Sequence, residues 1–341
     1  MTRARCRRLL LGMGAVLDSS IVQRVVPAVL LSACIELPDF PDGNVVVEPR
    51  PLAIVADPPE ARPGQAVQLS LMLSHPIATS NVQWRVCGEY FSFSGGNQYG
   101  DGQSGEGCGE DDPSFASGER AELPGLLSTA LFANLDLARE VLGASLPEGA
   151  IELVRMRVGV PVLVEARMEH ERRTLRATKR VLVSERADGN DNPPPPRFML
   201  GDELVIGVED PDLPFVCAGA SGRVPVVEPS SEVKLAPIVE GSGEDEDDRE
   251  EPWLERYQII DARGDLQNRT ETAFYSWYVS DGGEIDPGTT KAPDRDATWK
   301  TPKAPGCHRV WVIVRDGHGG TSACGVDIAV GLDGESCTSD R

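Results

Sequence analysis

The sequence predicts a mainly β protein made of two tandem β-sandwich domains, with one helical insert in the first domain. Several short runs alternate apolar and polar residues, which is the period of a half-buried strand. Gly (35 residues) and Pro (27 residues) are frequent enough to separate such runs with turns. Each half also carries a Trp among alternating apolar residues, and we expect Trp84 and Trp277 to fill the two cores.

Residues 1–33 have the features of a targeting segment. They contain five Arg and one Asp, and two apolar stretches of nine residues that are too short to span a bilayer. The second stretch ends in Leu31-Ser32-Ala33-Cys34, which resembles the lipobox of bacterial lipoproteins. This resemblance implies cleavage before Cys34, acylation (palmitate) at that residue and, with Ile35 next in the chain, an outer-membrane destination. The alternative is an ordinary secretory signal, cut near Ala15.

The chain is strongly acidic. It carries 33 basic and 54 acidic residues, a formal net charge of −21, and cleavage before Cys34 would remove a further excess of positive charge. Nucleic-acid binding needs a basic surface that neutralises phosphates, so we expect no nucleic-acid partner. The expected contacts are the membrane, through the lipid anchor, and a protein or glycan ligand at the cell envelope, on its periplasmic or surface side.

Cysteine usage agrees with export. Six Cys lie beyond the targeting segment and the lipidation site, and an even number in an exported chain predicts three disulfides. Cys87 and Cys108 are the pair in the first half of the sequence, so we expect them to form one bridge. Three pairings remain open for the other four, which are Cys217, Cys307, Cys324 and Cys337.

The first half of the chain has a tether followed by strands. Residues 34–50 are rich in Pro and acidic residues and are expected to be extended, and the first domain is expected over residues 51–186. Residues 67–73 alternate as a half-buried strand. Apolar residues recur at helical spacing from residue 126 to 142, which predicts the helical insert. A closing pair of strands is expected over 158–167 and 174–184.

A proline-rich linker over residues 187–199 is expected to separate the two domains. Its sequence Asn190–Pro196 (NDNPPPP) favours a stiff polyproline spacer. The second domain is expected over residues 200–332, with an acidic loop at 241–252 and a C-terminal tail at 333–341. Its strongest predicted strand is His308–Arg315, followed by the turn Asp316–Gly320 (DGHGG).

Part of the second domain resembles a known family. Tyr275–Gly283 (YSWYVSDGG), Thr298–Pro302 (TWKTP) and the strand ending in Arg315-Asp316-Gly317 resemble the PKD-type and related Ig-like domains of bacterial surface proteins. The resemblance covers about 110 residues and implies a sandwich with a core Trp on a central strand. The first domain resembles Ig-like domains more loosely, through Pro63-Gly64 and Trp84.

The register of the last hairpin restricts the late disulfides. A turn at Asp316–Gly320 places Cys324 opposite Val312 and about 16 Å from Cys307, too far for a bridge. In Ig-like sandwiches the first strand commonly runs beside the last, so the resemblance implies Cys217–Cys324 with Cys307–Cys337. The second choice is Cys217–Cys307 with Cys324–Cys337.

Catalytic and metal-binding motifs are not recognisable in the sequence, and we expect no cofactor. Four His, at positions 75, 170, 308 and 318, show no zinc-protease spacing. The acidic loop could offer oxygen ligands to Ca²⁺ through Asp245, Asp247 and Asp248, but a solvated loop is the simpler interpretation.

Trp311 and Ile313 share one face of their strand. That face is either a binding surface or a contact with the first domain or a loop.

These observations predict a non-enzymatic, lipid-anchored cell-envelope protein with a binding, adhesion or structural role. One alternative is a carbohydrate-binding module or an accessory subunit of an exported enzyme complex. Such a module would present coplanar exposed aromatic side chains. Another alternative is an exported hydrolase without a recognisable motif, which would bring His and carboxylate side chains together in a pocket.

Overall fold

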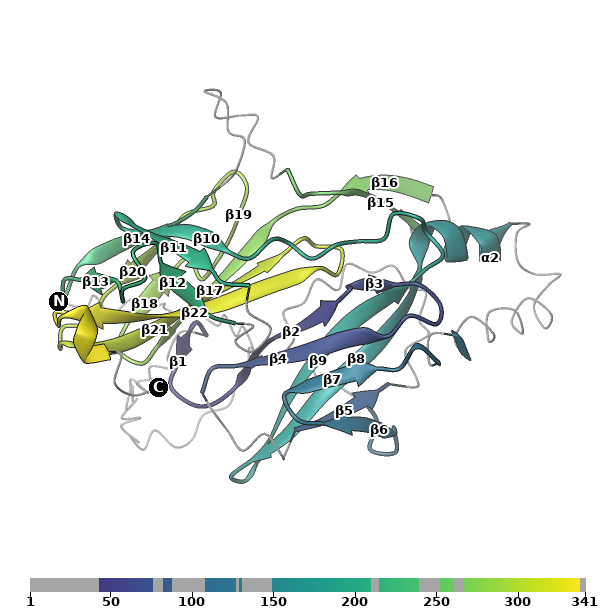
Figure 1. Ribbon diagram of the computed structural model, residues 1–341, viewed down its shortest axis with the longest axis horizontal. Coiled ribbons are helices and arrows are strands. Elements are labelled where there is room, and N and C mark those ends of the chain that lie inside the picture. Colours follow the sequence, from purple (N-terminus) through teal and green to yellow (C-terminus); the bar gives the residue numbers. More distant parts are fainter. Residues whose placement is uncertain are drawn as a thin grey trace, which may run out of the picture. The chain divides into compact units, whose positions relative to one another are not determined.

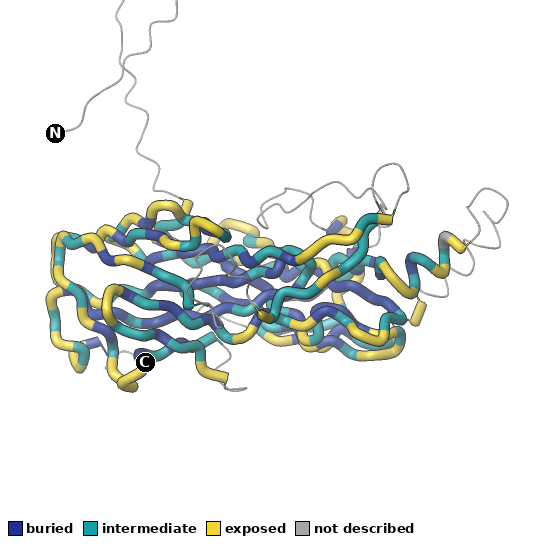
Figure 2. The backbone as a smooth tube through the Cα atoms, turned by 90° about the horizontal axis from the view of Figure 1, so that it is seen from above, coloured by how far each residue is buried: buried dark blue, intermediate teal, exposed yellow. Residues whose placement is uncertain are grey.

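The structure is a computed structural model that describes residues 43–75, 82–87, 108–126, 129–130, 149–209, 215–238, 252–260 and 266–337 (Figure 1). It is mainly β, as predicted, and two sandwiches belong to one compact unit that spans residues 41–341. Buried residues follow the strands of both sandwiches (Figure 2). Among the described helices, none has the length and apolar character needed to cross a membrane.

The first sandwich packs a three-stranded sheet against a five-stranded sheet. The smaller sheet has the order β2 (Pro51–Asp57), β4 (Val67–Leu73), β7 (Arg120–Leu123). The larger has the order β3 (Glu60–Ala61), β9 (Arg173–Val183), β8 (Val160–His170), β5 (Val82–Val86), β6 (Ser114–Ser117). A short helix, α2 (Ala150–Leu153), and a π-helical turn, η2 (Val154–Val158), lead into β8.

The core of the first sandwich follows from strand alternation. On β4 the buried residues Val67, Leu69 and Leu71 face the larger sheet. Trp84 is fully buried, as predicted, and its indole nitrogen donates a hydrogen bond to the Gly118 carbonyl oxygen at 2.7 Å. This bond replaces the one that the indole nitrogen would make to water, so the large ring is buried without leaving an unsatisfied donor.

The second sandwich has two six-stranded sheets. In one, the order is β1 (Val45–Val46), β17 (Phe274–Ser280), β21 (Gly306–Arg315), β22 (Thr321–Val330), β13 (Val226–Val227), and β19 (Thr289–Lys291) also pairs with β17. In the other, the order is β12 (Cys217–Gly219), β11 (Glu203–Gly207), β10 (Arg197–Leu200), β14 (Glu232–Pro237), β20 (Ala297–Lys300), β18 (Glu284–Asp286). The described part of the chain ends in the 3₁₀ turn η4 (Gly334–Cys337).

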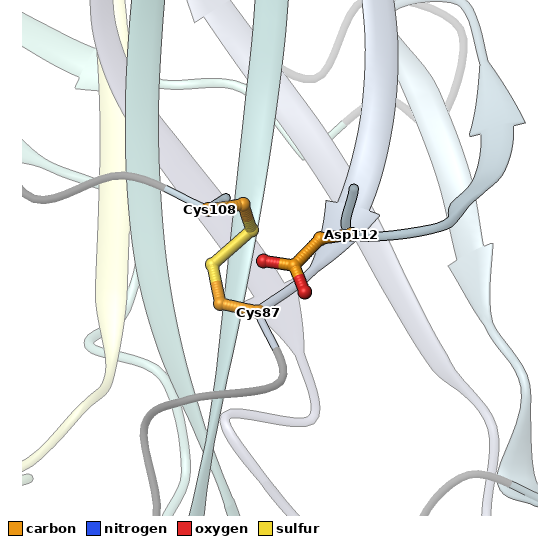
Figure 3. A group of neighbouring side chains, drawn as sticks. All are labelled: Cys87, Cys108 and Asp112. Carbon is orange, nitrogen blue, oxygen red and sulfur yellow. A yellow bond between two sulfur atoms is a disulfide. The ribbon is translucent and has the colours of Figure 1, made fainter. Parts of the chain in front are cut away.

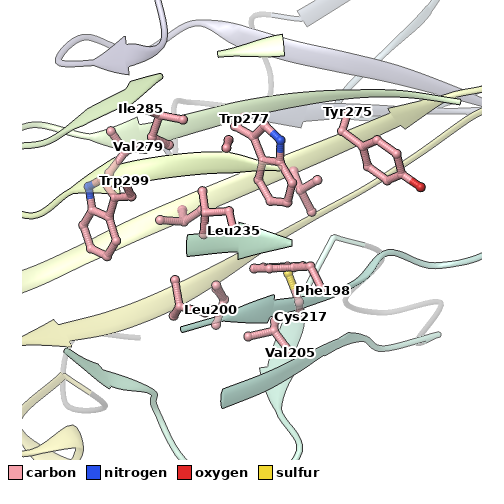
Figure 4. Packing of buried hydrophobic residues seen from close by; sticks show 14 of the residues in the cluster. Phe198, Leu200, Val205, Cys217, Leu235, Tyr275, Trp277, Val279, Ile285 and Trp299 are labelled. Carbon is pink, nitrogen blue, oxygen red and sulfur yellow. The ribbon is translucent and has the colours of Figure 1, made fainter. Parts of the chain in front are cut away.

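Aromatic residues fill the second core (Figure 4). Trp277 is fully buried, as predicted, and meets the ring of Phe198 edge to face at a centroid distance of 5.2 Å. Trp299 is also fully buried, and it lies against the backbone of Gly283. A Cβ atom at Gly283 would stand 2.3 Å from the Trp299 indole nitrogen, so this close approach requires glycine.

The last hairpin has the predicted register. Arg315 lies opposite Thr321, and Val312 lies opposite Cys324. The later disulfides are Cys217–Cys324 and Cys307–Cys337, the pairing implied by the Ig-like resemblance. A parallel bridge between Val216 and Gly325 brings the segment before β12 beside β22, so Cys217 can link the two sheets.

The predicted tether is only partly correct, because its end belongs to the second sandwich. Val45 and Val46 form β1, a parallel partner of β17. The side-chain amide of Asn44 donates to the Trp277 carbonyl oxygen at 2.8 Å, and Val46 is 1% exposed. The two residues of β1 are too few to show the alternation that predicts a strand. The prediction for this segment therefore depends on its Pro-rich and acidic composition, which favours an extended tether.

Several predictions fall mainly outside the described residues. They are the lipobox with Cys34, the acidic loop with Asp245, Asp247 and Asp248, and nearly all of the predicted helix 126–142. Beyond the acidic loop, β15 (Arg256–Ile260) and β16 (Leu266–Thr270) form a separate two-stranded hairpin. β15 lies beside η2 of the first sandwich.

Candidate functional site at the seam between the sandwiches

Trp311 and Ile313 lie in the contact between the two sandwiches, which we call the seam. Their exposed fractions are 2% and 0%, and they belong to one apolar cluster with Leu52, Ala53 and Met72 of the first sandwich. The predicted binding surface at Trp311 and Ile313 is therefore wrong, because β2 and β4 cover that face of the sheet. The alternative, a contact with the first domain, is confirmed.

Gly325 makes room for Trp311 at the seam. The two residues face each other across β21 and β22. A Cβ atom at Gly325 would lie 2.6 Å from Cδ1 of Trp311, so any larger residue would displace the indole ring. The close packing of the seam thus depends on a glycine as well as on large apolar residues.

The predicted linker is part of the seam and does not keep the domains apart. The side-chain amide of Asn192 donates to the Ala56 carbonyl oxygen of the first sandwich at 2.8 Å, and its oxygen accepts from the Thr321 N–H of the second at 2.9 Å. The prediction of a spacer over 187–199 is therefore wrong, since polar side chains before the prolines bind both sandwiches. Its last residues, from Arg197, already form β10.

Lys179 of β9 reaches from the first sandwich into the β21–β22 turn. Its ammonium nitrogen donates to the Gly319 carbonyl oxygen at 2.5 Å and to the Thr321 hydroxyl at 2.7 Å. Burial lowers the pKa of Lys179 to about 7, Asp316 acts in the opposite direction and Arg315 adds to the lowering. The residue as a whole is half-buried, and its ammonium nitrogen is held by these two acceptors of the turn.

Asp316 organises the turn that receives Lys179. It is fully buried, and its carboxylate accepts backbone N–H groups of His318 (2.6 Å), Gly319 (2.9 Å) and Gly320 (2.8 Å). A fourth donor is the side-chain amide of Asn190, at 3.0 Å. Four donors satisfy both carboxylate oxygens, which stabilises an anion in this buried position.

Glu60 holds the linker from the side of the first sandwich. Its carboxylate accepts from the Asn190 N–H at 2.9 Å, from Arg186 at 3.2 Å and from the Ser184 hydroxyl. A polar cavity of about 190 Å³ lies beside this network, and Arg62 contributes to its wall. This volume is larger than one water molecule requires, so the cavity can hold several water molecules or one small polar molecule.

Glu271 and His318 form the other side of the seam. Their side chains approach to 3.5 Å, and the His318 ring stacks on Tyr257 of β15 at a centroid distance of 3.9 Å. Glu271 also accepts the Glu255 N–H at 2.8 Å. Burial raises the pKa of Glu255, and the nearby carboxylates of Glu271 and Asp191 raise it further.

The Cys87–Cys108 bridge is the third disulfide, as predicted, and Asp112 stands beside it (Figure 3). The two sulfur atoms and an Asp112 oxygen lie within 4.8 Å of one another. Disulfide sulfur lacks the thiolate charge that binds metals, so the oxidised cluster is not a metal site. Asp112 instead accepts the Gly109 N–H at 2.7 Å and so shapes the turn after the bridge.

Sequence reasoning missed the polar half of the seam. Asn190 and Asn192 look like linker residues, and Lys179 looks like a solvent-exposed residue in a basic strand. A usable signal existed in β9, where Lys179 stands at the same parity as the buried residues Val181 and Val183. A charged residue on the core side of a strand predicts a buried partner from elsewhere in the chain.

The fold and the seam together define a mainly β, disulfide-bonded protein. Its two sandwiches are joined by an apolar cluster and by hydrogen bonds between polar groups. No family model and no curated protein matches the chain. Solved structures similar to it include three N-terminal domains of the bacteriophage RB49 highly immunogenic outer capsid protein (8% identity, TM-score 0.19), with 83% of this chain and 59% of that one covered. Murine CEACAM1b is another (9% identity, TM-score 0.20; 83% and 100% covered).

A Bacteroides ovatus glucan-utilization protein, SGBP-B, solved with a mixed-linkage heptasaccharide, is also similar (10% identity, TM-score 0.19). The match covers 84% of this chain and 47% of that one. At such TM-scores these similarities carry no argument about function, and the fold assignment rests on the sheets and cores described above.

Proposed function

We propose that this chain is an exported, lipid-anchored cell-envelope protein with a binding or structural role, in which the two sandwiches act as one rigid element. The observation that carries the rigid-element proposal is the seam. Trp311 and Ile313 are buried in it, and Lys179, Asn190 and Asn192 cross it by hydrogen bonds. Large, apolar contacts between domains oppose the relative motion that is otherwise the default.

Export is supported by the three disulfides, because such bonds persist in oxidising compartments. The anchor proposal rests on Leu31-Ser32-Ala33-Cys34, and an outer-membrane location is part of it. Nine residues separate Cys34 from Asn44, the residue bonded to Trp277 of the second sandwich. An extended chain of that length reaches about 30–35 Å, so the anchor would hold the folded body close to the bilayer.

Metabolic labelling with palmitate tests the anchor. We expect label on the wild-type protein, no label and no processing in Cys34→Ser, and normal labelling in the matched variant Cys6→Ser, which changes a cysteine inside the predicted targeting segment. Label that persists in Cys34→Ser, or a wild-type protein without label, would disprove lipidation at Cys34.

A glycan-binding role is less well supported by the described part of the chain. Its exposed large hydrophobic side chains are all aliphatic or Met: Val47, Leu126, Met156, Val208, Val226 and Leu266. Glycan binding usually relies on the faces of exposed aromatic rings. A wider hollow of about 670 Å³ beside α2 and η2 likewise shows no aromatic residue on its described wall.

A hydrolase is also less well supported. Ser74 and His75 approach a nucleophile–base pair most closely among the described residues, with 3.1 Å between the hydroxyl oxygen and Nδ1. The Ser74 hydroxyl is buried and already accepts the Arg50 N–H at 3.0 Å, so it is poorly placed to attack a substrate.

A further inference from the structure

The hairpin of β8 and β9 is basic, although the chain as a whole is acidic. Residues 167–180 contain five Arg and two Glu, besides Lys179 in the seam, whereas the formal net charge of the chain is −21. Arg167 of β8 and Arg176 and Arg180 of β9 alternate with residues that pack into the core. All three therefore lie on the outer face of the five-stranded sheet.

The arginine side chains of this face are only partly matched by carboxylates. Arg167 lies directly opposite Arg176, and such a pair of like charges destabilises a sheet. Arg167 also contacts Glu169 at 3.5 Å. Arg172, at the tip of the hairpin, Arg176 and Arg180 are exposed, and their side chains make no hydrogen bond or ion pair with the part of the chain that the structure describes. Three guanidinium groups are thus available to an anionic partner.

The remaining carboxylates of the hairpin leave this positive excess in place. Glu165 lies on the same face, but it is fully buried and accepts the Cys108 N–H at 3.0 Å. Glu171 is exposed at the tip, where it offsets one positive charge. The outer face of β9 stays positive along its length.

The chain leaves the folded body beside the tip of this hairpin. Glu48 forms an ion pair with Arg173, the first residue of β9. The guanidinium group of Arg50 donates to the Gly43 carbonyl oxygen at 2.6 Å, where the described chain begins. Cys34 is nine residues before Gly43, a reach of about 30 Å in an extended chain. An anchor at Cys34 would therefore keep the hairpin near the bilayer.

We propose that the β8–β9 hairpin docks on the anionic phospholipid headgroups of the bilayer that holds the anchor, through Arg172, Arg176 and Arg180. Guanidinium groups bind phosphate oxygens by paired, charge-assisted hydrogen bonds. The eight steps from Arg172 to Arg180 span about 26 Å, which is long enough to meet several headgroups. The choice of partner rests on the proposed lipid anchor.

The acidity of the rest of the protein does not prevent this docking. Charges more than about 8 Å apart are largely screened at physiological salt, so the arginines at the contact act on the headgroups while carboxylates on the far side do not. A weak contact is sufficient, because the anchor turns docking into an intramolecular event with a high effective concentration.

Energy transfer from a dye on the sheet to labelled lipids tests the docking. Residues 35–341, which include the whole compact unit, carry an N-terminal hexahistidine tag that binds nickel-chelating lipids in place of the anchor. The dye is attached at Gln83→Cys, an exposed position opposite Arg167 on the outer face. Transfer should be greater on vesicles of phosphatidylcholine mixed with phosphatidylglycerol than on phosphatidylcholine alone. The difference should be lost in about 1 M NaCl.

The triple variant Arg172→Ser, Arg176→Ser and Arg180→Ser should lose the response to phosphatidylglycerol. Its Tm should be no lower than that of the wild type, since these side chains are exposed and one of them faces a like charge.

A matched control removes the same charge elsewhere. Arg223→Ser with Arg256→Ser and Arg269→Ser, all at exposed positions, should keep the full response. The same transfer on both kinds of vesicle in the wild type, a response that survives in the hairpin variant, or an equal loss in the control variant would overturn the proposal. Binding of dextran sulfate to the hairpin without any response to phosphatidylglycerol would also overturn it, in favour of an anionic glycan. Because the tag replaces the lipid, none of these results depends on acylation of Cys34, which palmitate labelling decides.

Discussion

The ammonium nitrogen of Lys179, in the first sandwich, lies 2.5 Å from the carbonyl oxygen of Gly319, in the β21–β22 turn of the second. The contact joins two residues that are 140 positions apart in the sequence. It places an ionisable group inside the seam, where its two hydrogen-bond acceptors, the Gly319 carbonyl oxygen and the Thr321 hydroxyl, are neutral and the Asp316 carboxylate lies near. The stability of the seam should therefore depend on pH in a way that one residue controls.

Between pH 7 and pH 10.5, the stability of the protein should rise with pH. Burial lowers the pKa of Lys179 from 10.5 to about 7 in the folded state, so in this window the unfolded chain binds the proton more strongly. Each pH unit should increase the unfolding free energy by about 1.4 kcal/mol at most. Below pH 7 the Lys179 contribution should level off, because both states are then protonated.

Urea unfolding of wild type and Lys179→Met across this pH range measures the effect. The variant should lose this slope, since Met has a similar volume and no titrating group. An exposed lysine replaced in the same way, Lys303→Met, should keep the wild-type slope. Equal slopes in wild type and Lys179→Met would show that the amine is not buried in solution.

Loss of the indole at the seam should be costly. Trp311→Ala removes a 2% exposed ring between the sandwiches, and we expect a loss of about 3–5 kcal/mol in unfolding free energy. Val226→Ala, at a position that is 57% exposed, should change stability by less than about 0.5 kcal/mol. A similarly small effect of Trp311→Ala would mean that the seam is not packed.

Gly325 and Trp311 should be energetically coupled. Gly325→Ala places a methyl group 2.6 Å from the indole ring and should destabilise the wild-type protein. In the Trp311→Ala background the same substitution should cost far less, because the obstructing ring is absent. A double-mutant cycle measures the difference. Additive effects would contradict the close contact between the two residues.

Peptide mapping without reduction should find the linked pairs Cys87–Cys108, Cys217–Cys324 and Cys307–Cys337. The Cys217–Cys324 bridge joins residues 107 positions apart, so its removal by paired Ser substitutions should cost about 4–5 kcal/mol. The Cys307–Cys337 bridge spans 30 positions and should cost less. A peptide pair that links Cys307 to Cys324 would contradict the register of β21 and β22.

Much of the fold could be predicted from the sequence because alternation and turn residues act locally. Residues 67–73 form the strand β4, and the turn at Asp316–Gly320 gives the register that excludes a Cys307–Cys324 bridge. The seam could not be predicted in the same way. Whether Trp311 faces solvent or another domain depends on β2 and β4, which lie more than 200 residues earlier in the chain.

The polar part of the seam was harder still to predict. Asn190 and Asn192 acquire their roles only when the turn after β21 is placed beside them. The segment Asn190–Pro196 contains four consecutive prolines, and this composition predicts a stiff spacer. Pattern analysis of one segment cannot show that Asp316, 126 residues away, accepts a hydrogen bond from Asn190. Long-range pairing of polar groups therefore needs the structure.

The central claim is that two sandwiches joined by the seam behave as one unit, and calorimetry tests it most directly. A scan of the protein without its targeting segment should show one transition, with a calorimetric enthalpy equal to the van't Hoff enthalpy. Trp311→Ala should lower that transition or split it in two. Two separate transitions in the wild-type protein, each with its own two-state enthalpy, would contradict the account.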